Sequence, residues 1–237
     1  TLSNAGHIPG AGMLNVATES KNILFTGDFD TRNSPLTSGA KPIKSDILFI
    51  EGTYGGRNHA NQQEELKRFI ENIVRVTDIG GTVLIPAFAN GRTQDMLMRL
   101  HQNCPELDVH VDGMGKRISK LYLENSRFIR DPRALNDAWN WSRRVSSKSD
   151  RKKALDADVI VSTSGMLQGG PSIWYLNRLR HDMENEIFFT GYQARDTGGR
   201  KLQNESKVHI FGKEVDISLN WESFSFSTYA GHKEITE

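Results

Sequence analysis

Two side chains that could bind a metal ion lie near the start of the chain. His7 stands in the segment AGHIPGAGM, where the glycines let the backbone turn tightly beside the imidazole. Asp28 follows the apolar run NILFTG, so its carboxylate is expected at the carboxyl end of a strand, where α/β folds tend to bind ligands. Imidazole and carboxylate are both ordinary zinc ligands, but two residues do not complete a site and a lone histidine is usually structural.

A third acidic side chain, Glu51, also follows an apolar run, in the segment SDILFIEGTYGG. It is expected at a strand end, like Asp28. Its alternative role is to cap the turn that follows the strand.

Two glycine-rich segments each end a strand and open a helix. PAFANGRTQDML contains Gly91 and Arg92, and STSGMLQGGPS contains Ser164 and Gly165. Backbone amides at a helix start attract anions, so a phosphate chain could bind there. Neither segment has the spacing of a P-loop or a dinucleotide fingerprint, and close packing of strand on helix also explains the glycines.

One basic stretch, WSRRVSSKSDRKKALD, could contact phosphates. A solvated loop and helix face is the commoner meaning of such a run. The chain as a whole has 30 basic and 29 acidic residues, so any polyanion site has to be local. The basic side chains of the stretch are Arg143, Arg144, Lys148, Arg151, Lys152 and Lys153.

The elements that would position these side chains alternate between strands and helices. The clearest helix is 62–76, where apolar residues recur at helical spacing with charges on the other face. This alternation predicts an α/β fold with mostly parallel pairing in the middle of the chain, followed by a β-hairpin over 207–219 with its turn at Gly212 and Lys213. The remaining expected elements are strands at 22–26, 46–50, 82–86, 109–111, 158–162 and 186–190, and helices at 93–101 and 118–123.

Composition limits the class of protein. The 237 residues are 37% hydrophobic and 25% charged, which is ordinary for a globular protein and excludes disordered and fibrous classes. No apolar run approaches the roughly 20 residues of a membrane span. The single Cys104 rules out an internal disulfide, and a cytoplasmic location is expected. Because the chain starts at Thr1 and not at methionine, we expect a fragment, a processed product or part of a split protein.

Taken in order, these segments resemble the β-CASP branch of the metallo-β-lactamase superfamily, especially proteins similar to the nuclease subunit of the cleavage and polyadenylation specificity factor. AGHIPGAGM resembles the third metal motif of the superfamily and FTGDFDTRNSPL the fourth. IEGTYGGR resembles motif A of the β-CASP group and SFSTYAGHKEI its motif C. Between them, three segments resemble successive blocks of the β-CASP insertion: GGTVLIPAFANGRTQDML, VIVSTSGMLQGGPS and FFTGYQARDTGGRKL.

The resemblance implies a partial metallo-β-lactamase αββα lobe with an inserted β-CASP α/β domain. The lobe would consist of 1–53 and a return segment, 196–237, and the β-CASP domain of 54–195. It also implies a zinc-dependent ribonuclease with two zinc ions. His7 would bind one zinc, Asp28 would bridge both, and Glu51 would orient a ligand histidine.

In the family, the blocks with Arg92, Ser164, Gly165 and Gly191 line the cleft where RNA enters. These residues would contact or position phosphate, and RNA is the expected partner.

Motif B of the resemblance departs from the family pattern. Lys201 stands near the position where eukaryotic relatives carry a general-acid histidine, with Arg200 beside it. Both could contact phosphate, although lysine is less suited to donating a proton at neutral pH.

Two departures concern the metal site itself. The His-x-His-x-Asp-His motif that supplies most zinc ligands is absent, and Tyr229 occupies the last ligand position, where a neutral phenol is a poor substitute. His232, three residues later, is a less favoured replacement. The other five histidines, His59, His101, His110, His181 and His209, are expected to be structural or exposed.

The leading hypothesis is therefore a zinc-dependent ribonuclease that is incomplete and inactive as this isolated chain, with partial zinc occupancy or none. Its missing motifs would lie on an absent N-terminal segment or a companion subunit, and a homodimer is possible. The rival hypothesis is a non-catalytic RNA-processing subunit or scaffold of the same fold, which Tyr229 favours. The third hypothesis is a nucleotide-binding protein, but the sequence does not contain the glycine-rich motif that this function needs.

Overall fold

A computed structural model describes residues 1–236, which fold as two compact units. Unit 1 contains Thr1–Ala60, Tyr122–Arg133 and the segment from Ser227 onward. Unit 2 contains Asn61–Leu121 and Ala134–Phe226.

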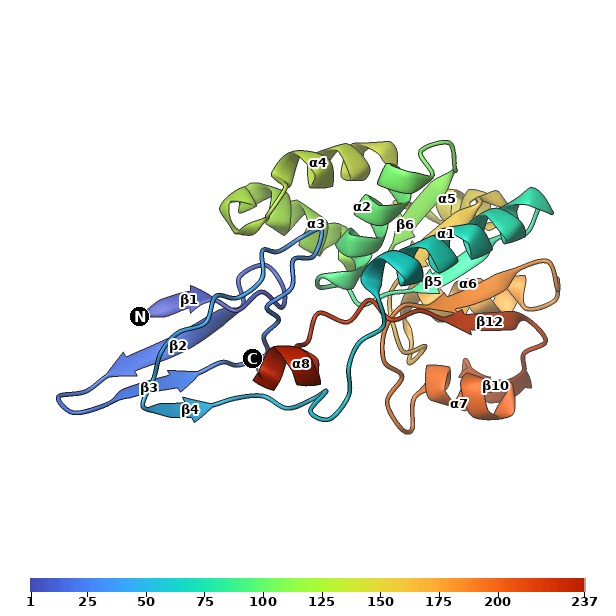
Figure 1. The fold of residues 1–237 in the computed structure, drawn as a ribbon. Coiled ribbons are helices and arrows are strands. Elements are labelled where there is room, and N and C mark those ends of the chain that lie inside the picture. Colours follow the sequence, from blue (N-terminus) through green and yellow to red (C-terminus); the bar gives the residue numbers. More distant parts are fainter. Residues whose placement is uncertain (237) are drawn as a thin grey trace. The chain divides into compact units, whose positions relative to one another are not determined.

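Unit 1 is built on a four-stranded sheet in the order β1-β2-β3-β4 (Figure 1). β1, β2 and β3 pair antiparallel, and β4 pairs parallel to β3. The shorter elements of this unit are the 3-10 helix Ser126–Phe128 and the helix α8 (His232–Thr236). The strands are β1 (Leu2–Asn4), β2 (Gly12–Ala17), β3 (Asn22–Phe25) and β4 (Ile47–Phe49).

One face of this sheet carries the small core of unit 1. Met13 and Leu24 point to that face and are buried. They pack in a cluster with Phe29 from the loop after β3 and with Ala230 from the C-terminal segment. The core of unit 1 thus joins the two ends of the described chain.

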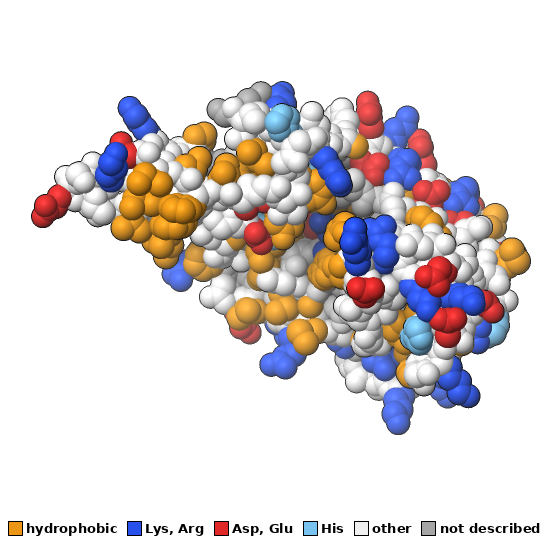
Figure 2. All heavy atoms as spheres, turned by 90° about the horizontal axis from the view of Figure 1, so that it is seen from below, with side chains coloured by type: hydrophobic (Ala, Val, Ile, Leu, Met, Phe, Trp, Pro, Cys, Tyr) orange, Lys and Arg blue, Asp and Glu red, His pale blue; other side chains and the backbone are white. Residues whose placement is uncertain are grey.

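The other face of the sheet is apolar and exposed. Residues that are paired in register share a face, and the pairs Leu14 with Phe25 and Phe25 with Phe49 bring three large side chains together. The rings of Phe25 and Phe49 stack with centroids 4.6 Å apart. Phe49 nevertheless exposes 55% of its surface. Figure 2 shows hydrophobic side chains gathered on the surface of these strands.

Unit 2 is built on a six-stranded sheet in the order β12-β9-β5-β8-β6-β7, and all of its pairings are parallel (Figure 1). The four central strands are buried at every residue, as expected for a parallel sheet covered on both faces. The strands are β5 (Val83–Pro86), β6 (Val109–Asp112), β7 (Arg143–Arg144), β8 (Val159–Ser162), β9 (Glu186–Phe189) and β12 (Asn220–Ser223).

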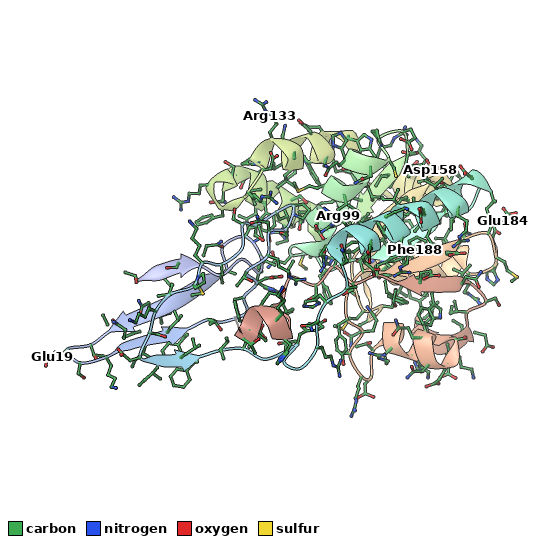
Figure 3. All side chains as sticks on the ribbon, in the orientation of Figure 1. Glu19, Arg99, Arg133, Asp158, Glu184 and Phe188 are labelled. Atoms are coloured by element: carbon green, nitrogen blue, oxygen red, sulfur yellow. The ribbon has the colours of Figure 1, made fainter. Side chains whose placement is uncertain are left out.

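Helices cover the two faces of this sheet. On one face Phe69 of α1 (Gln62–Asp78) packs against Phe188 of β9, which is labelled in Figure 3. On the other face Phe189 packs in a cluster with residues of α6 (Gly170–Leu179) and α7 (Gly198–Glu205). Neighbouring residues of a strand point to opposite faces of the sheet. Phe188 therefore packs against the helices on one face, and Phe189 packs against the helices on the other.

The remaining elements of the chain surround this sheet or lie at the unit boundaries. A β-hairpin, β10 (Lys207–Ile210) and β11 (Lys213–Asp216), follows α7. Its turn residues are Phe211 and Gly212, both with positive φ, so the predicted turn at Gly212 and Lys213 was wrong by one residue. The other helices are α2 (Arg92–Asn103), α3 (Gly115–Glu124), α4 (Pro132–Trp141), α5 (Lys148–Lys153) and the 3-10 helix Ala154–Asp156.

The predicted α/β architecture, with a large parallel sheet flanked by helices, is confirmed. The domain limits at residues 54 and 195 stay a prediction; in the structure, residues 196–226 pack within unit 2. None of the helices described for residues 1–236 combines the length and the hydropathy needed to cross a bilayer.

Candidate functional site

His7 is held in a fixed orientation by the C-terminal segment of unit 1. Its Nδ1 lies 2.8 Å from the carbonyl oxygen of Thr228, and since a carbonyl can only accept, Nδ1 carries the proton. In the neutral ring Nε2 then carries the lone pair, and it lies 4.0 Å from Oδ2 of Asp28. A backbone carbonyl that fixes one ring nitrogen is a common arrangement behind a metal-binding histidine.

The backbone before His7 requires glycine. Gly6 has a φ of +74°, and a Cβ atom there would lie 2.2 Å from the carbonyl oxygen of Asp30. The chain segments that carry His7 and Asp30 can therefore approach each other only with glycine at position 6.

Tyr229 completes the group that the sequence predicted. Its ring lies 4.4 Å from the ring of His7, and its hydroxyl donates to Oδ2 of Asp28 at 3.2 Å. Burial, and then the nearby charge of Asp28, raise the pKa of the Tyr229 hydroxyl to about 12. At neutral pH the side chain is therefore a neutral phenol that binds the carboxylate.

Arg32 attaches the C-terminal segment to this group. Its guanidinium donates two hydrogen bonds to the buried carboxylate of Asp30, at 2.9 and 2.7 Å. It also donates to the carbonyl oxygens of Ser227 and Tyr229. Bidentate pairing of this kind fixes direction as well as distance. The Asp30–Arg32 pair thus holds Tyr229 in place.

His59 supports the same segment from another side. Its Nε2 lies 2.9 Å from the carbonyl oxygen of Tyr229, and its ring packs at 4.6 Å from the ring of Tyr54. Burial, followed by the positive charge of Arg32, lowers the pKa of His59 below its usual value. A neutral ring that donates from Nε2 is a structural histidine, as predicted.

One carboxylate oxygen of Glu51 accepts a hydrogen bond, and the other has no hydrogen-bond partner within residues 1–236. Oε2 accepts from the backbone NH of Thr53 at 2.7 Å, which is the turn-capping role considered above. Oε1 is buried and has no hydrogen-bond partner among the described residues. A buried carboxylate oxygen without a donor is costly, so Oε1 is available to a donor such as a histidine NH.

The residues present do not fit a complete two-zinc centre. His7 and Asp28 could share one ion after a small rotation, since tetrahedral zinc ligands lie about 3.4 Å apart. Within residues 1–236, however, no three His, Cys, Asp or Glu side chains gather closely enough to hold a metal ion. His232 does not add a ligand, because its Nδ1 accepts from the backbone NH of Gly56 at 3.3 Å.

In unit 2 the phosphate-binding candidates lie after three parallel strands that follow one another in the sheet as β9, β5 and β8. Gly165 follows β8, Gly191 follows β9, and both loops are joined by Gln193, whose buried amide nitrogen donates to the carbonyl oxygens of the two glycines. Ser164 Oγ accepts from the backbone NH of Gln168 at 3.1 Å. Arg92 begins α2 and forms an ion pair of 2.7 Å with Asp95.

Lys201 and Arg200 both lie in α7, but they differ in what they contact. The ammonium group of Lys201 forms ion pairs with Glu214 and, at 4.0 Å, with Glu205. The hydrogen bond to Glu214 raises the pKa of Lys201, which makes it a weaker proton donor. Arg200 donates from Nε to the carbonyl oxygen of Gln193 at 2.9 Å.

Comparison with known proteins identifies the domain in unit 2. Residues 93–202 match the family model described as Beta-Casp domain. The chain therefore contains a β-CASP domain. The match begins in α2 and ends in α7, so it includes β6, β8 and β9 with their loops.

Relatives of this chain match it along its whole length. It is 34% identical over 241 residues to RNase aCSPSF2 of Saccharolobus solfataricus, which covers 100% of this chain and 49% of the relative. It is 35% identical over 246 residues to Probable RNase MJ4 of Methanocaldococcus jannaschii, covering 100% and 58% respectively. It is 34% identical over 263 residues to Transcription termination factor FttA of Thermococcus kodakarensis, covering 100% and 40%. The chain thus spans about half the length of the curated relatives it matches.

Sequence reasoning missed several residues that support the candidate sites of this chain. Asp30 and Arg32 follow Asp28 at alternate positions, a spacing that could have suggested a local ion pair. Gln193 and the bond from His59 to Tyr229 had no such signal, because their partners are distant in sequence or are backbone atoms.

Proposed function

We propose that this chain is part of a metal-dependent RNA-processing ribonuclease. Unit 1 contributes His7 and Asp28 to a zinc site, and the loops at the carboxyl ends of β5, β8 and β9 in unit 2 bind RNA. The relatives named RNase, together with the Beta-Casp domain, support this function, and β-CASP nucleases are generally metal-dependent.

The observation that carries the proposal is the orientation of His7 toward Asp28. The two residues are 21 positions apart, yet Nε2 and Oδ2 lie 4.0 Å apart with the opposite ring nitrogen fixed by Thr228. Glu51 adds a buried oxygen that can accept from a further ligand histidine. The remaining ligands would come from another segment or a companion subunit.

The test is to complete the protein and to measure both metal content and cleavage. The chain is produced alone and joined to the remaining half of RNase aCSPSF2, and each form is analysed for bound zinc and for cutting of a 5′-labelled single-stranded RNA. The joined protein should bind zinc and cut the RNA, and the chain alone should do neither. Replacing Asp28 by alanine in the joined protein should abolish both.

A folded joined protein that binds no zinc and leaves the RNA intact would overturn the proposal. The control is Asp46→Ala, which removes an exposed carboxylate that accepts from the backbone NH of Asn22 and has no part in the group around His7. Its zinc content and its cleavage rate should match those of the unchanged protein.

One observation favours a non-catalytic subunit instead. The Tyr229 hydroxyl already donates to Asp28, and a neutral phenol is a poor substitute for a ligand histidine. Tyr229→Phe and Tyr229→His separate the two functions by zinc affinity. If the completed protein acquires zinc only as Tyr229→His, the scaffold is the better description.

A further inference from the structure

Two large aromatic side chains are exposed in the loops of unit 2 that bear the phosphate-binding candidates. Phe88, two residues after β5, exposes 39% of its surface, and Tyr192, three residues after β9, exposes 60%. β5 and β9 are neighbours in the parallel sheet, so both rings lie at its carboxyl edge. A ligand that covers an exposed aromatic ring removes apolar surface from water, which is favourable.

The ring of Phe88 rests on glycine backbone. A Cβ atom at Gly191 would lie 3.2 Å from Cε2 of Phe88, and one at Gly165 would lie 2.8 Å from the backbone nitrogen of Phe88. Any side chain at either position would press on Phe88 or cover its ring. Glycine in both loops therefore keeps the aromatic surface in place and accessible.

The loops that carry the two rings are each held by hydrogen bonds. The carbonyl oxygen of Phe88 accepts from both the backbone NH and the hydroxyl of Thr93, at 3.0 and 2.8 Å. Gln193 joins the loops of Gly165 and Gly191 through its amide nitrogen. Because Tyr192 lies between Gly191 and Gln193, its backbone is fixed by the same contacts.

A positive charge accompanies the second ring. The guanidinium carbon of Arg200 lies 5.5 Å from the ring centroid of Tyr192. Its Nε donates to the carbonyl oxygen of Gln193 at 2.9 Å, which fixes the guanidinium beside this ring. A cation beside exposed rings at one sheet edge suits a ligand that has both flat bases and phosphates.

We propose that Phe88 and Tyr192 stack on unpaired bases of single-stranded RNA, with Arg200 contacting the phosphate between them. This inference rests on the proposed function and names the residues that make it selective for single strands. In a duplex the base faces are covered by their neighbours, so rings of this kind bind only bases that are unstacked.

The test is a comparison of binding to two oligomers that differ only in their bases. One is a short fluorescent oligouridylate, and the other is an abasic oligomer with the same number of phosphates. Dissociation constants are measured by fluorescence anisotropy for the unchanged chain and for Phe88→Ala, Phe88→Leu and Tyr192→Ala. Phe88→Leu keeps an apolar side chain against the glycines but removes the aromatic face.

Each alanine variant should bind oligouridylate about 10-fold more weakly, since stacking on one base contributes about 1 to 3 kcal/mol. Phe88→Leu should lose most of the same affinity. Binding of the abasic oligomer should change less than about 2-fold, because its phosphate contacts remain. Arg200→Gln should weaken the binding of both oligomers. It should also lower the slope of log affinity against log salt concentration by about one, as expected for the loss of one phosphate contact.

Phe211→Ala is the matched control, since Phe211 is 70% exposed in the turn between β10 and β11 of the same unit. It should leave both constants unchanged. Equal losses for the two oligomers in Phe88→Ala and Phe88→Leu, or unchanged oligouridylate binding in Tyr192→Ala, would overturn the inference while the proposed function stands. Failure of the unchanged chain to bind either oligomer would overturn the RNA-binding part of the proposed function as well.

Discussion

The sheets of units 1 and 2 differ in how much of their surface the described residues cover. In unit 2 the strands β5, β6, β8 and β9 are buried at all positions, because helices from the same unit lie on both faces. In unit 1 the strands bury one face only, and Leu14, Phe25 and Phe49 are exposed on the other.

The larger hydrophobic core and the metal-binding candidates therefore lie in different units. Unit 2 holds the larger hydrophobic clusters, so it has the means to fold on its own core. Unit 1 holds the metal-binding candidates, yet its core cluster is small and an extensive apolar face is exposed. Substitutions should therefore affect the two units very differently.

The largest expected effect is on a buried ring of the unit 2 sheet. Phe189→Ala should lower the free energy of unfolding by about 3 to 5 kcal/mol, because Phe189 is almost fully buried. Phe49→Ala in unit 1 should cost at most about 1 kcal/mol, mainly from its stacking with Phe25.

Urea unfolding followed by tryptophan fluorescence measures the free energy of unfolding of unit 2. All four tryptophans, Trp139, Trp141, Trp174 and Trp221, belong to that unit, while far-ultraviolet circular dichroism reports on both. Similar losses in the two variants would contradict the distinction between the sheets.

The next effect concerns the buried thiol of unit 2. Burial, and then the charge of Glu106, raise the pKa of Cys104 from 9.0 to about 11. Two pKa units lower the thiolate fraction about 100-fold, so dithionitrobenzoate should label native Cys104 at least about 100-fold more slowly than the unfolded chain. Cys104→Ser with Ser20→Cys moves the thiol to an exposed turn of unit 1 and should label rapidly. Equal labelling rates for the two native proteins would show that unit 2 opens readily.

A smaller effect is expected from the ion pair that holds the C-terminal segment of unit 1. Asp30→Ala should destabilise this segment by about 2 kcal/mol, which is less than for a fully buried pair because the Arg32 side chain is 23% exposed. Hydrogen exchange of the backbone around Ser227 should accelerate, and the tryptophan transition of unit 2 should not move.

Glu71→Ala is the control for that ion pair. Glu71 pairs at 3.7 Å with Lys67 on the surface of α1, and its loss should cost less than about 0.5 kcal/mol. If Asp30→Ala left exchange around Ser227 unchanged, Arg32 would not be what holds the segment.

The smallest effect is a pH dependence of unit 1. Because the pKa of His59 is lower in the folded than in the unfolded chain, the unfolded chain binds more protons just below pH 6.5. The contribution of His59 to the free energy of unfolding is complete above pH 6.5, and it is lost as the pH falls toward the pKa of His59 in the folded chain. The loss should be the smallest of these effects, because the ring is only half buried.

His59→Gln should remove this part of the pH dependence, measured by circular dichroism on unfolding at about pH 7.5 and about pH 5.5. His209→Gln, at an exposed position of unit 2, is the control. An unchanged slope in His59→Gln would show that other groups cause it.

Much of the unit 2 sheet could be predicted because its elements have local patterns. The strands over Thr82–Pro86 and Asp158–Ser162 were expected from short apolar runs, and the helix from Gln62 from its amphipathic spacing. The helix Pro132–Trp141 was not predicted, although Leu135, Ala138 and Trp139 recur at helical spacing and are buried. The hairpin turn was misplaced because Phe211 adopts the left-handed conformation that favours glycine.

The sequence by itself determined which residue types are able to bind metal or phosphate, and the family resemblance predicts that Tyr229 stands at a ligand position. Only the tertiary structure decided that His7 would contact Thr228, 221 residues away, and that Arg32 would join Asp30 to the backbone of Tyr229. Strand and helix patterns depend on neighbours in the chain, whereas such contacts depend on packing that closes very long loops and on backbone carbonyls that no side-chain pattern encodes.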